Sequence, residues 1–249
     1  MSDCLKCDRY TAWNRIGEEP KLKEPWCPEC KKKHPDEYAP IYAEWFNRNA
    51  GTLLREMGVP PLYRACTLDG FVAEEKDQRR VLQAVRSWFD SELAGLFLCG
   101  PPGTGKTHLA VSTLLGLRGY RHSGQFASVQ ELLMECRDSF RSDNGLSSVL
   151  KKYSECDALL LDDLGAENST EFARETLGML IDRAYRTGQI LIVTSNLDLN
   201  ALAQKLDARS ADRLVEICLP IRLTSSSYRQ KIAAKRAATR NRPVAQVLQ

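Results

Sequence analysis

The chain has 249 residues, of which 43% are hydrophobic and 27% are charged, and its formal net charge is +3. This length allows one substantial core with a small appendage, and this composition excludes a wholly disordered chain. No apolar stretch is long enough to cross a bilayer and the N-terminus has no apolar signal core, so we expect a cytoplasmic protein with no membrane partner.

Four of the nine cysteines form two pairs near the N-terminus. Cys4 and Cys7 make one C-x-x-C pair, Cys27 and Cys30 make the second, and 19 residues separate the pairs. This spacing is typical of a structural zinc site, where four thiolates surround Zn²⁺ and metal binding replaces the core that so short a module lacks. We therefore predict a zinc-binding module over residues 1–40. Disulfides are the alternative, and a cytoplasmic setting disfavours them.

Residues 41–92 are predicted to form a helical linker. Apolar residues recur at helical spacing over 41–58, and the Pro-Pro pair that follows ends this helix. A second helix is predicted over 74–93, with Trp88 on its apolar side. The two helices would join the N-terminal module to the rest of the chain.

Residues 93–249 alternate between two kinds of segment. Apolar, strand-like runs are found at 95–99, near 125–129, at 157–162, at 189–194 and near 217–223. Helical patterns lie between them at 106–118, 129–140, 145–153 and 171–187. Strands that alternate with helices predict an α/β domain in which a parallel sheet is covered on both faces.

The segment GPPGTGKT follows the first predicted strand, and its last residues begin the helix predicted over 106–118. This segment matches the phosphate-loop pattern G-x-x-x-x-G-K-[ST] in its expected context, and a surface turn rich in Gly and Pro is the disfavoured alternative. Its glycines let backbone N–H groups converge on phosphate oxygens, and the helix start adds a positive dipole end. The predicted nucleotide contacts are Gly100, Pro101, Pro102, Gly103, Thr104, Gly105, Lys106, Thr107 and His108. Lys106 is expected to reach the β and γ phosphates of ATP, and the Thr107 hydroxyl to bind Mg²⁺.

Two further predicted strands end in polar side chains. Asp162 and Asp163 close the third strand, at the sheet edge where ligands gather in open α/β folds. We predict that Asp162 holds Mg²⁺ and that Asp163 polarises the attacking water, a role more often filled by Glu. Asn196 ends the fourth strand and is predicted to orient that water. The alternatives are an acidic turn for the aspartates and a helix N-cap for Asn196.

The C-terminal part of the chain is basic. No acidic residue occurs from Ile217 onward, and seven basic residues follow. They are Arg222, Arg229, Lys231, Lys235, Arg236, Arg240 and Arg242. Such a tail favours contact with nucleic acid, although a solvated surface explains the same residues.

These motifs together resemble the AAA+ ATPases over roughly residues 60–240. Within that superfamily the chain is most similar to the DnaC/DnaI-type helicase loaders and the related IstB transposition ATPases. The segments that carry the likeness are VPPLYRACTLDGF, LLLDDLGAE, IVTSN and RSADRLVE…IRLTSSSYRQ. The resemblance implies an AAA+ P-loop core with a five-stranded parallel sheet over residues 93–249.

The resemblance also implies a homo-oligomer in which an arginine of one subunit reaches the γ-phosphate held by its neighbour. Arg213 matches that position, Arg209 lies close to it, and a helix-surface arginine paired with Asp207 or Asp212 is the alternative. Arg229, in Ser227-Tyr228-Arg229, matches the ending typical of the loaders, and we predict that it contacts the nucleotide. Only 36 residues follow Arg213, so we expect the helical lid of many AAA+ proteins to be reduced or absent.

The partners implied by the resemblance are a hexameric replicative helicase and single-stranded DNA. Residues 1–40 would dock the helicase, and Arg137, Arg141, Lys151 and Lys152 are the candidates for contact with DNA phosphates. The leading hypothesis is therefore an ATP-dependent helicase loader. Its aspartate pair departs from the usual Asp-Glu, which favours slow, switch-like hydrolysis. An IstB-like regulator of transposition is the alternative, and a nucleotide-binding adaptor with negligible hydrolysis is a third.

Overall fold

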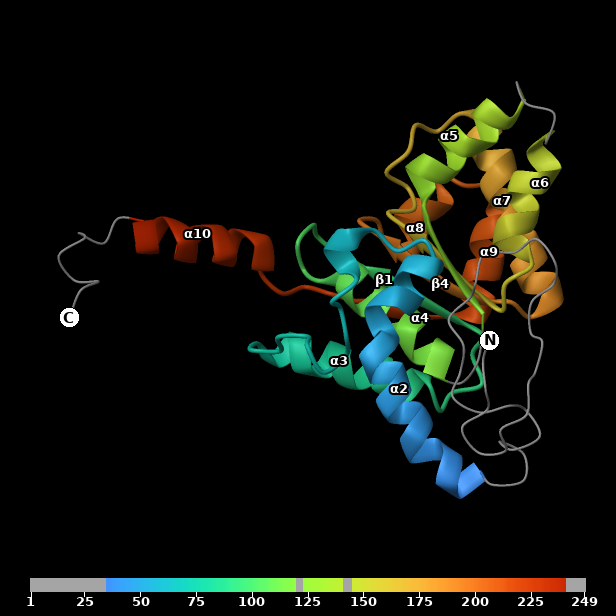
Figure 1. Cartoon of the computed structure of the whole chain (residues 1–249). Helices are drawn as coiled ribbons and strands as arrows, with labels where there is room; N and C mark the ends of the chain where they lie inside the picture. The colour runs from blue at the N-terminus through green and yellow to red at the C-terminus, as the bar shows by residue number, and fades with distance from the viewer. Residues whose placement is uncertain (1–34, 120–122, 141–144, 241–249) are drawn as a thin grey trace, which may run out of the picture.

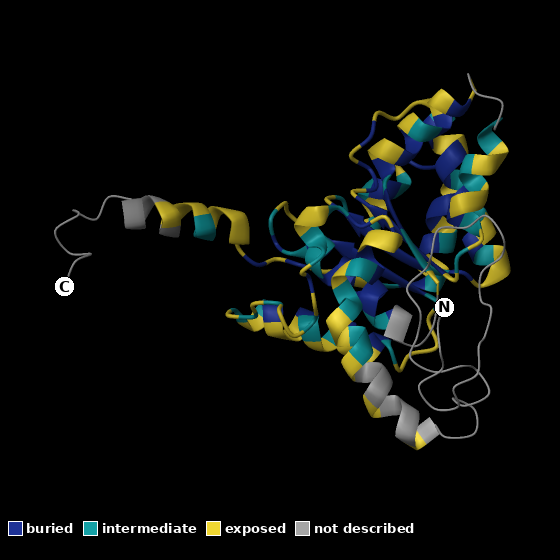
Figure 2. Cartoon of the chain, in the orientation of Figure 1, coloured by how far each residue is buried: buried dark blue, intermediate teal, exposed yellow. Residues whose placement is uncertain are grey.

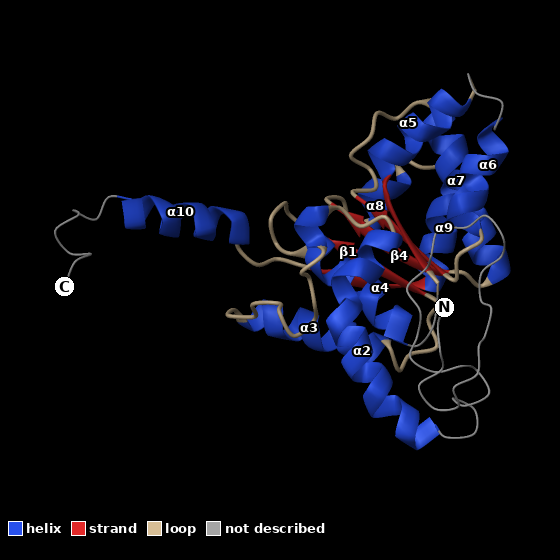
Figure 3. Ribbon diagram, viewed as in Figure 1, coloured by secondary structure: helices blue, strands red, loops and turns tan. Residues whose placement is uncertain are grey.

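The structure is a computed structural model that describes residues 35–119, 123–140 and 145–240. Its centre is one sheet of five parallel strands in the order β2-β3-β4-β1-β5 (Figure 3). The strands are β1 (Gly95–Cys99), β2 (Gly124–Ser128), β3 (Ala158–Asp162), β4 (Ile190–Ser195) and β5 (Cys218–Arg222). The predicted five-stranded parallel sheet is therefore confirmed.

Three helices cover one face of this sheet. They are α2 (Pro35–Glu56), α3 (Lys76–Trp88) and α4 (Lys106–Gly119). Because side chains alternate along a strand, Leu96 and Leu98 of β1 point to this face, where they pack in one core with Leu54 and Val85. Helices α2 and α3, predicted as a linker, thus share the core of the sheet (Figure 2).

Five helices lie on the opposite face (Figure 1). They are α5 (Val129–Ser139), α6 (Gly145–Ser154), α7 (Glu171–Thr187), α8 (Leu199–Ala203) and α9 (Ala208–Ile217). Phe97 and Cys99, the other residues of β1, join this second core together with Leu177 and Leu214. The strands are buried from both sides, which is why they read as almost unbroken apolar runs in the sequence.

The helices before the sheet begin and end at different residues from those predicted. Helix α2 starts at Pro35 and continues through Pro40, which removes one backbone donor near the helix start without ending the helix. Helix α3 ends at Trp88, five residues before the predicted end. The buried indole Nε1 of Trp88 donates a 2.8 Å hydrogen bond to the Gly95 carbonyl, and this contact fixes the turn into β1.

After β5 the described chain holds one more helix, α10 (Tyr228–Arg240), which extends away from the body of the molecule (Figure 1). A short 3₁₀ helix, η1 (Pro61–Tyr63), lies between α2 and α3. None of the helices in the described residues is long and apolar enough to span a membrane.

Candidate functional site

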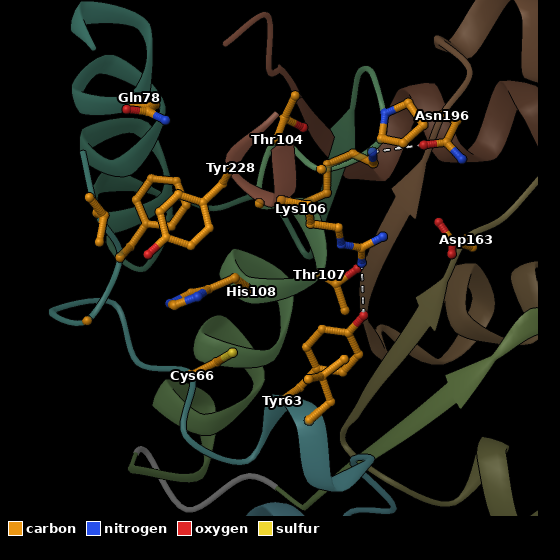
Figure 4. Close-up of a pocket in the computed structure, with 18 residues that line it drawn as sticks. Tyr63, Cys66, Gln78, Thr104, Lys106, Thr107, His108, Asp163, Asn196 and Tyr228 are labelled. Carbon is orange, nitrogen blue, oxygen red and sulfur yellow. Dashed lines mark hydrogen bonds between the residues drawn. The ribbon is translucent and has the colours of Figure 1, made fainter. Parts of the chain in front are cut away.

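A cavity of about 360 Å³ opens beside the carboxyl ends of the central strands (Figure 4). Residues 102–105, between β1 and α4, form its floor together with the first residues of α4. Asp163 and Asn196 approach from the ends of β3 and β4. Segment 62–78 and the start of α10 form the remaining wall. The predicted phosphate loop therefore borders a cavity at the sheet edge where the sequence predicts the nucleotide site.

Glycines give the phosphate loop its path. Gly100, Gly103 and Gly105 have φ angles of 139°, 81° and 99°, a region that residues with a Cβ rarely adopt. A Cβ on Gly105 would lie 2.7 Å from the ring of Phe71, so the close packing of this loop also needs glycine. The Thr104 hydroxyl donates to the Pro101 carbonyl at 2.9 Å and closes the turn.

Lys106 is buried at the base of this loop. Its Nζ donates to the carbonyls of Gly100 and Pro101 at 2.8 and 2.9 Å, and to Oδ1 of Asn196 at 2.9 Å (Figure 4). Burial lowers the pKa of Lys106, while the nearby carboxylates of Asp163 and Asp162 oppose that shift. Each of the three N–H donors of the ammonium therefore has an acceptor within the protein. Each can donate to a phosphate oxygen instead.

Asp162 and Thr107 lie together as a Mg²⁺ site would require. The Thr107 hydroxyl donates to Oδ1 of Asp162 at 3.0 Å, and the Thr194 hydroxyl donates to the same oxygen at 2.7 Å. Burial raises the pKa of Asp162, and the neighbouring carboxylate of Asp163 adds to that effect. A hydroxyl and a buried carboxylate in contact next to a phosphate loop are oxygen donors of the kind that Mg²⁺ prefers, so these residues fit the ion.

Asp163 has an unusual backbone. Among the described residues other than glycine, only Asp163 has a positive φ, at 59°. Its N–H donates to the Thr194 hydroxyl at 2.9 Å, and the next N–H, of Leu164, donates to the Thr194 carbonyl at 2.9 Å. This left-handed turn is sparsely populated, and it is maintained here by two bonds to β4 while the carboxylate lines the cavity.

Asn196 is not a helix cap. The N-cap of α8 is Asp198, whose carboxylate accepts from the N–H of Ala201 at 2.9 Å. Asn196 instead lines the cavity and accepts the hydrogen bond from Lys106. The alternative of an N-cap is therefore wrong, and the amide oxygen contacts the lysine of the phosphate loop.

The outer wall of the cavity contains apolar and aromatic side chains that sequence reasoning did not assign. Tyr63, Phe71 and Tyr228 line it together with Arg229, whose Nη2 lies 3.4 Å from the Tyr63 hydroxyl (Figure 4). The imidazole Nε2 of His108 lies 2.8 Å from the Thr67 carbonyl, so His108 fixes this wall to α4. Tyr63 and Phe71 belong to the segment VPPLYRACTLDGF. This segment supports the family resemblance, but the sequence predicts no functional role for its residues. Such a wall suits the flat, apolar face of a nucleotide base.

Arg213 does not belong to this cavity. It is on α9, forms an ion pair with Asp182 of α7, and does not line the cavity of its own chain. Its guanidinium also lies over the ring of Tyr185, 5.1 Å from the centroid, and only 11% of its side chain is exposed. Arg213 is thus ion-paired within its own chain, as the alternative expected, although its partner is Asp182 and not the predicted Asp207 or Asp212. Asp207 instead caps α9 through Ser210.

The four candidates for DNA contact have different surroundings. Lys152 pairs with Glu135 at 3.2 Å and Lys151 with Glu155 at 3.5 Å, so carboxylates of the same chain partly neutralise both. The guanidinium of Arg137 lies over the ring of Phe172 at 5.4 Å, beside Phe140, whose residue surface is 64% exposed. Arg141 lies outside the described residues.

The predicted zinc ligands Cys4, Cys7, Cys27 and Cys30 also lie outside the described residues. The other five cysteines are unpaired thiols, and four of them are buried. Burial raises the pKa of Cys66 and of Cys136 to about 11. This agrees with the expectation that most of these cysteines are small core residues.

Comparison with known proteins gives consistent matches. The family model described as IstB-like ATP binding protein matches residues 45–237. The replicative helicase loader DnaC of Buchnera aphidicola subsp. Acyrthosiphon pisum is 27% identical over 188 residues, 72% of this chain and 76% of the relative. DnaC of Escherichia coli strain K12 is 26% identical over 185 residues, with 72% and 75% covered. A crystal structure of the DnaC helicase loader matches with a TM-score of 0.61 and 25% identity, covering 66% of this chain and all of that one. These likenesses confirm the α/β P-loop fold of the AAA+ type.

Proposed function

The chain belongs to the family of IstB-like ATP-binding proteins, and from that premise we propose that it is an ATP-dependent helicase loader. In this proposal it binds a replicative helicase and places it on single-stranded DNA. The observation that carries the ATPase part is the meeting of Lys106, Asp163 and Asn196 in one cavity over a phosphate loop. The loader part is supported by the likeness to proteins named DnaC.

ATP would lie with its triphosphate on the phosphate loop and its base against Tyr63, Phe71 and Tyr228. Lys106 would exchange its bonds to the loop carbonyls for bonds to the β and γ phosphates. Thr107 and Asp162 would hold Mg²⁺, which neutralises charge on the phosphate oxygens when it is bound. Backbone N–H groups of the loop, freed of side chains by glycine, would complete the contact with phosphate.

Hydrolysis would depend on Asp163 and Asn196. The positive φ of Asp163 directs its short carboxylate into the cavity, where it would accept a proton from the attacking water. Asn196 would orient the same water once Lys106 has turned to phosphate. Aspartate reaches one methylene less far than glutamate, so we expect slow turnover suited to a switch between two binding states.

The same site would be completed by a second copy of the chain. Arg213 does not line the cavity of its own chain, and Asp182 holds it on the surface formed by α7 and α9. In the proposed homo-oligomer Arg213 would leave Asp182 and stabilise charge on the γ-phosphate held by the neighbour. Arg209 is 74% exposed and lies 3.4 Å from Asp182, so it is the competing candidate for this role.

The DNA contact is proposed at the end of α5. Phe140 is exposed beside Arg137, and both touch the ring of Phe172. An exposed aromatic ring next to a cation suits a single strand, because bases stack on the ring while the cation neutralises phosphate. Lys151 and Lys152 contribute less in this account, since each is already paired with a carboxylate.

The helicase contact is proposed for residues 1–40, folded around Zn²⁺ by Cys4, Cys7, Cys27 and Cys30. Four thiolates form a closed tetrahedral shell with no open position, so this metal would be structural. A dedicated docking module of this kind favours the loader over proteins that act on DNA alone.

One second candidate is supported by the family description itself. An IstB-like ATPase that assembles on duplex DNA and recruits a transposase would use the same cavity and the same oligomer. The two candidates differ in their protein partner and in the form of DNA that stimulates ATP turnover.

The test is a capture experiment with the full chain and a variant that lacks residues 1–34, which keeps α2 and its core residue Leu54. Each is immobilised in ATP and Mg²⁺, exposed to native extract, and its bound proteins are identified by mass spectrometry. Capture of a hexameric replicative helicase by the full chain, and its loss from the variant with ATP binding retained, is the expected result. Capture of a transposase with no helicase contradicts the loader and supports the second candidate.

A further inference from the structure

Two segments that are distant in the sequence meet at the mouth of the cavity. Tyr63, Phe71 and Gln78 belong to the segment before the sheet, whereas Tyr228 and Arg229 begin the last described helix (Figure 4). Helix α10 extends away from the body beyond its first turn (Figure 1). The position of Tyr228 and Arg229 therefore depends on what holds this first turn.

The carboxylate that holds the turn is Glu75. Its Oε1 accepts hydrogen bonds from the Ser226 hydroxyl at 2.5 Å and from Nζ of Lys231 at 2.7 Å. Ser226 lies two residues before Tyr228, and Lys231 lies two residues after Arg229. The Glu75 carboxylate therefore binds residues on both sides of the two that line the cavity. The hydrogen bond from Lys231 lowers the pKa of Glu75, and the same bond raises the pKa of Lys231.

The ion pair of Lys231 with Glu75 is shorter and less exposed than its pair with the neighbouring Glu74. The side chains of Lys231 and Glu75 are 33% and 37% exposed, whereas the neighbouring Glu74 is 58% exposed and lies 3.8 Å from Lys231. Glu75 is also fixed from its own side, because its N–H donates to Oε1 of the buried Gln78 at 2.9 Å. The carboxylate is thus presented from a rigid helix start.

The turn that Glu75 holds is in direct contact with the phosphate loop. The N–H of Tyr228 donates to the Gly103 carbonyl at 2.9 Å, and Arg229 reaches the Tyr63 hydroxyl. A second bond, from the N–H of Thr224 to Asp77 at 2.9 Å, fastens the strand end that leads into the turn. A shift of the turn would therefore move the aromatic wall and the cation of Arg229 away from the nucleotide together.

From these contacts we infer that Glu75 is a positioning residue for the nucleotide pocket, acting through Ser226 and Lys231 on Tyr228 and Arg229. This inference rests on the proposed function, because it assigns a role in binding ATP. Glu75 itself does not touch the nucleotide in this account. Its loss should weaken binding by roughly two- to fivefold, the scale expected for a partly exposed charge pair rather than for a phosphate ligand.

The experiment measures equilibrium binding of a fluorescent ATP analogue with Mg²⁺ to the full chain by anisotropy. Glu75→Gln is compared with Glu74→Gln, a matched change at the adjacent and more exposed carboxylate. We expect Glu75→Gln to bind roughly two- to fivefold more weakly and Glu74→Gln to bind as the unmodified chain does. Exchange of the two charges in Glu75→Lys with Lys231→Glu should recover most of the affinity that either single reversal loses.

Arg229→Ala, alone and combined with Glu75→Gln, separates positioning from general stabilisation of the fold. If Glu75 acts through Arg229 and its neighbour, the second change should add less than its own full effect in the Arg229→Ala background. Full additivity of the two effects, or unchanged affinity in Glu75→Gln, overturns the inference while leaving the proposed function in place. Absence of ATP binding by the unmodified chain overturns both.

Discussion

Lys106 donates a hydrogen bond of 2.9 Å to Oδ1 of Asn196, and this bond joins the phosphate loop to the end of β4. The two residues are 90 positions apart in the sequence. In the absence of phosphate the amide satisfies one donor of a buried ammonium, which would otherwise carry a desolvation cost of about 1–3 kcal/mol. In the proposed function, phosphate oxygens would replace this amide, which would then be free to contact water.

Asn196→Ala should therefore separate binding from turnover. We expect ATP affinity to change by no more than about threefold, while the turnover number falls roughly a hundredfold, because a donor or acceptor that acts in the transition state is lost. Single-turnover hydrolysis and equilibrium binding measure the two quantities. Asn200→Ala, at an exposed position on α8, is the matched control and should behave like the unmodified chain. A large loss of affinity with normal turnover would contradict this role.

Asp163→Asn should retain ATP and stop its hydrolysis. Asparagine tolerates the positive φ at this position, so the backbone of the turn is preserved while the base is removed. Asp163→Glu tests the shortness of the side chain, and we expect it to raise turnover. The measurement is phosphate release at saturating ATP. Hydrolysis that persists in Asp163→Asn would reassign the general base to another residue.

Arg213→Ala should impair neighbouring subunits. When Arg213→Ala chains are mixed with Lys106→Ala chains, which keep Arg213 but lack the phosphate-loop lysine, we expect ATP turnover to exceed that of either variant alone, since an intact site can then receive an intact arginine from its neighbour. Arg209→Ala is the matched control on the same helix and should turn over ATP like the unmodified chain. If the two variants exchange these behaviours, Arg209 is the trans-acting residue. No recovery of turnover in either mixture would contradict action between subunits.

Phe140→Ala should weaken binding of single-stranded DNA by roughly tenfold, the scale of one lost base stack. Anisotropy of a labelled oligothymidine in ATP measures this affinity. Met134→Ala removes another exposed apolar side chain of α5 and should have little effect. Lys151→Ala should also have a small effect, because Glu155 already neutralises that lysine. Equal losses in all three variants would argue for a diffuse basic surface rather than a stacking site.

Cys27→Ser should release zinc and abolish helicase capture while leaving ATP binding intact. Loss of one thiolate would open the proposed closed site, whose metal would supply the folding energy of the module. Metal content of the purified chain, measured by elemental analysis, should be about one zinc per chain before the change. Cys156→Ser, at a half-buried cysteine of the ATPase core, should keep the metal. A chain purified without zinc that still captures helicase would contradict the module.

The strands and helices of the core could be predicted because each has a single strong signal. Strands β1 and β3 are apolar runs that lie between turn residues, and α7 begins at the cap Thr170 and ends at Gly188 with φ 68°. Helices α8 and α9 were not predicted. Each is short, and the aspartates at 198 and 207 that cap them resemble ordinary loop residues.

The site was predictable where its residues follow one motif and was missed where the fold brings distant segments together. Lys106 and Asp162 were found from local patterns. Tyr63 precedes all the strands of the sheet in the sequence and Tyr228 follows them, yet both line the same cavity. The pairing of Arg213 with Asp182, on another helix, has no local signal either. Thr194 could have been found, because it is a hydroxyl at the end of a strand next to Asp162.

Equilibrium binding of ATP with Mg²⁺ tests the central claim most directly. The unmodified chain should bind with a saturable isotherm, and Lys106→Ala should bind roughly a hundredfold more weakly, since at least two charge-assisted bonds to phosphate are lost. Lys151→Ala, the same change at an exposed lysine remote from the cavity, should bind normally. An unmodified chain that does not bind ATP, or a Lys106→Ala variant that binds it equally well, would contradict the account.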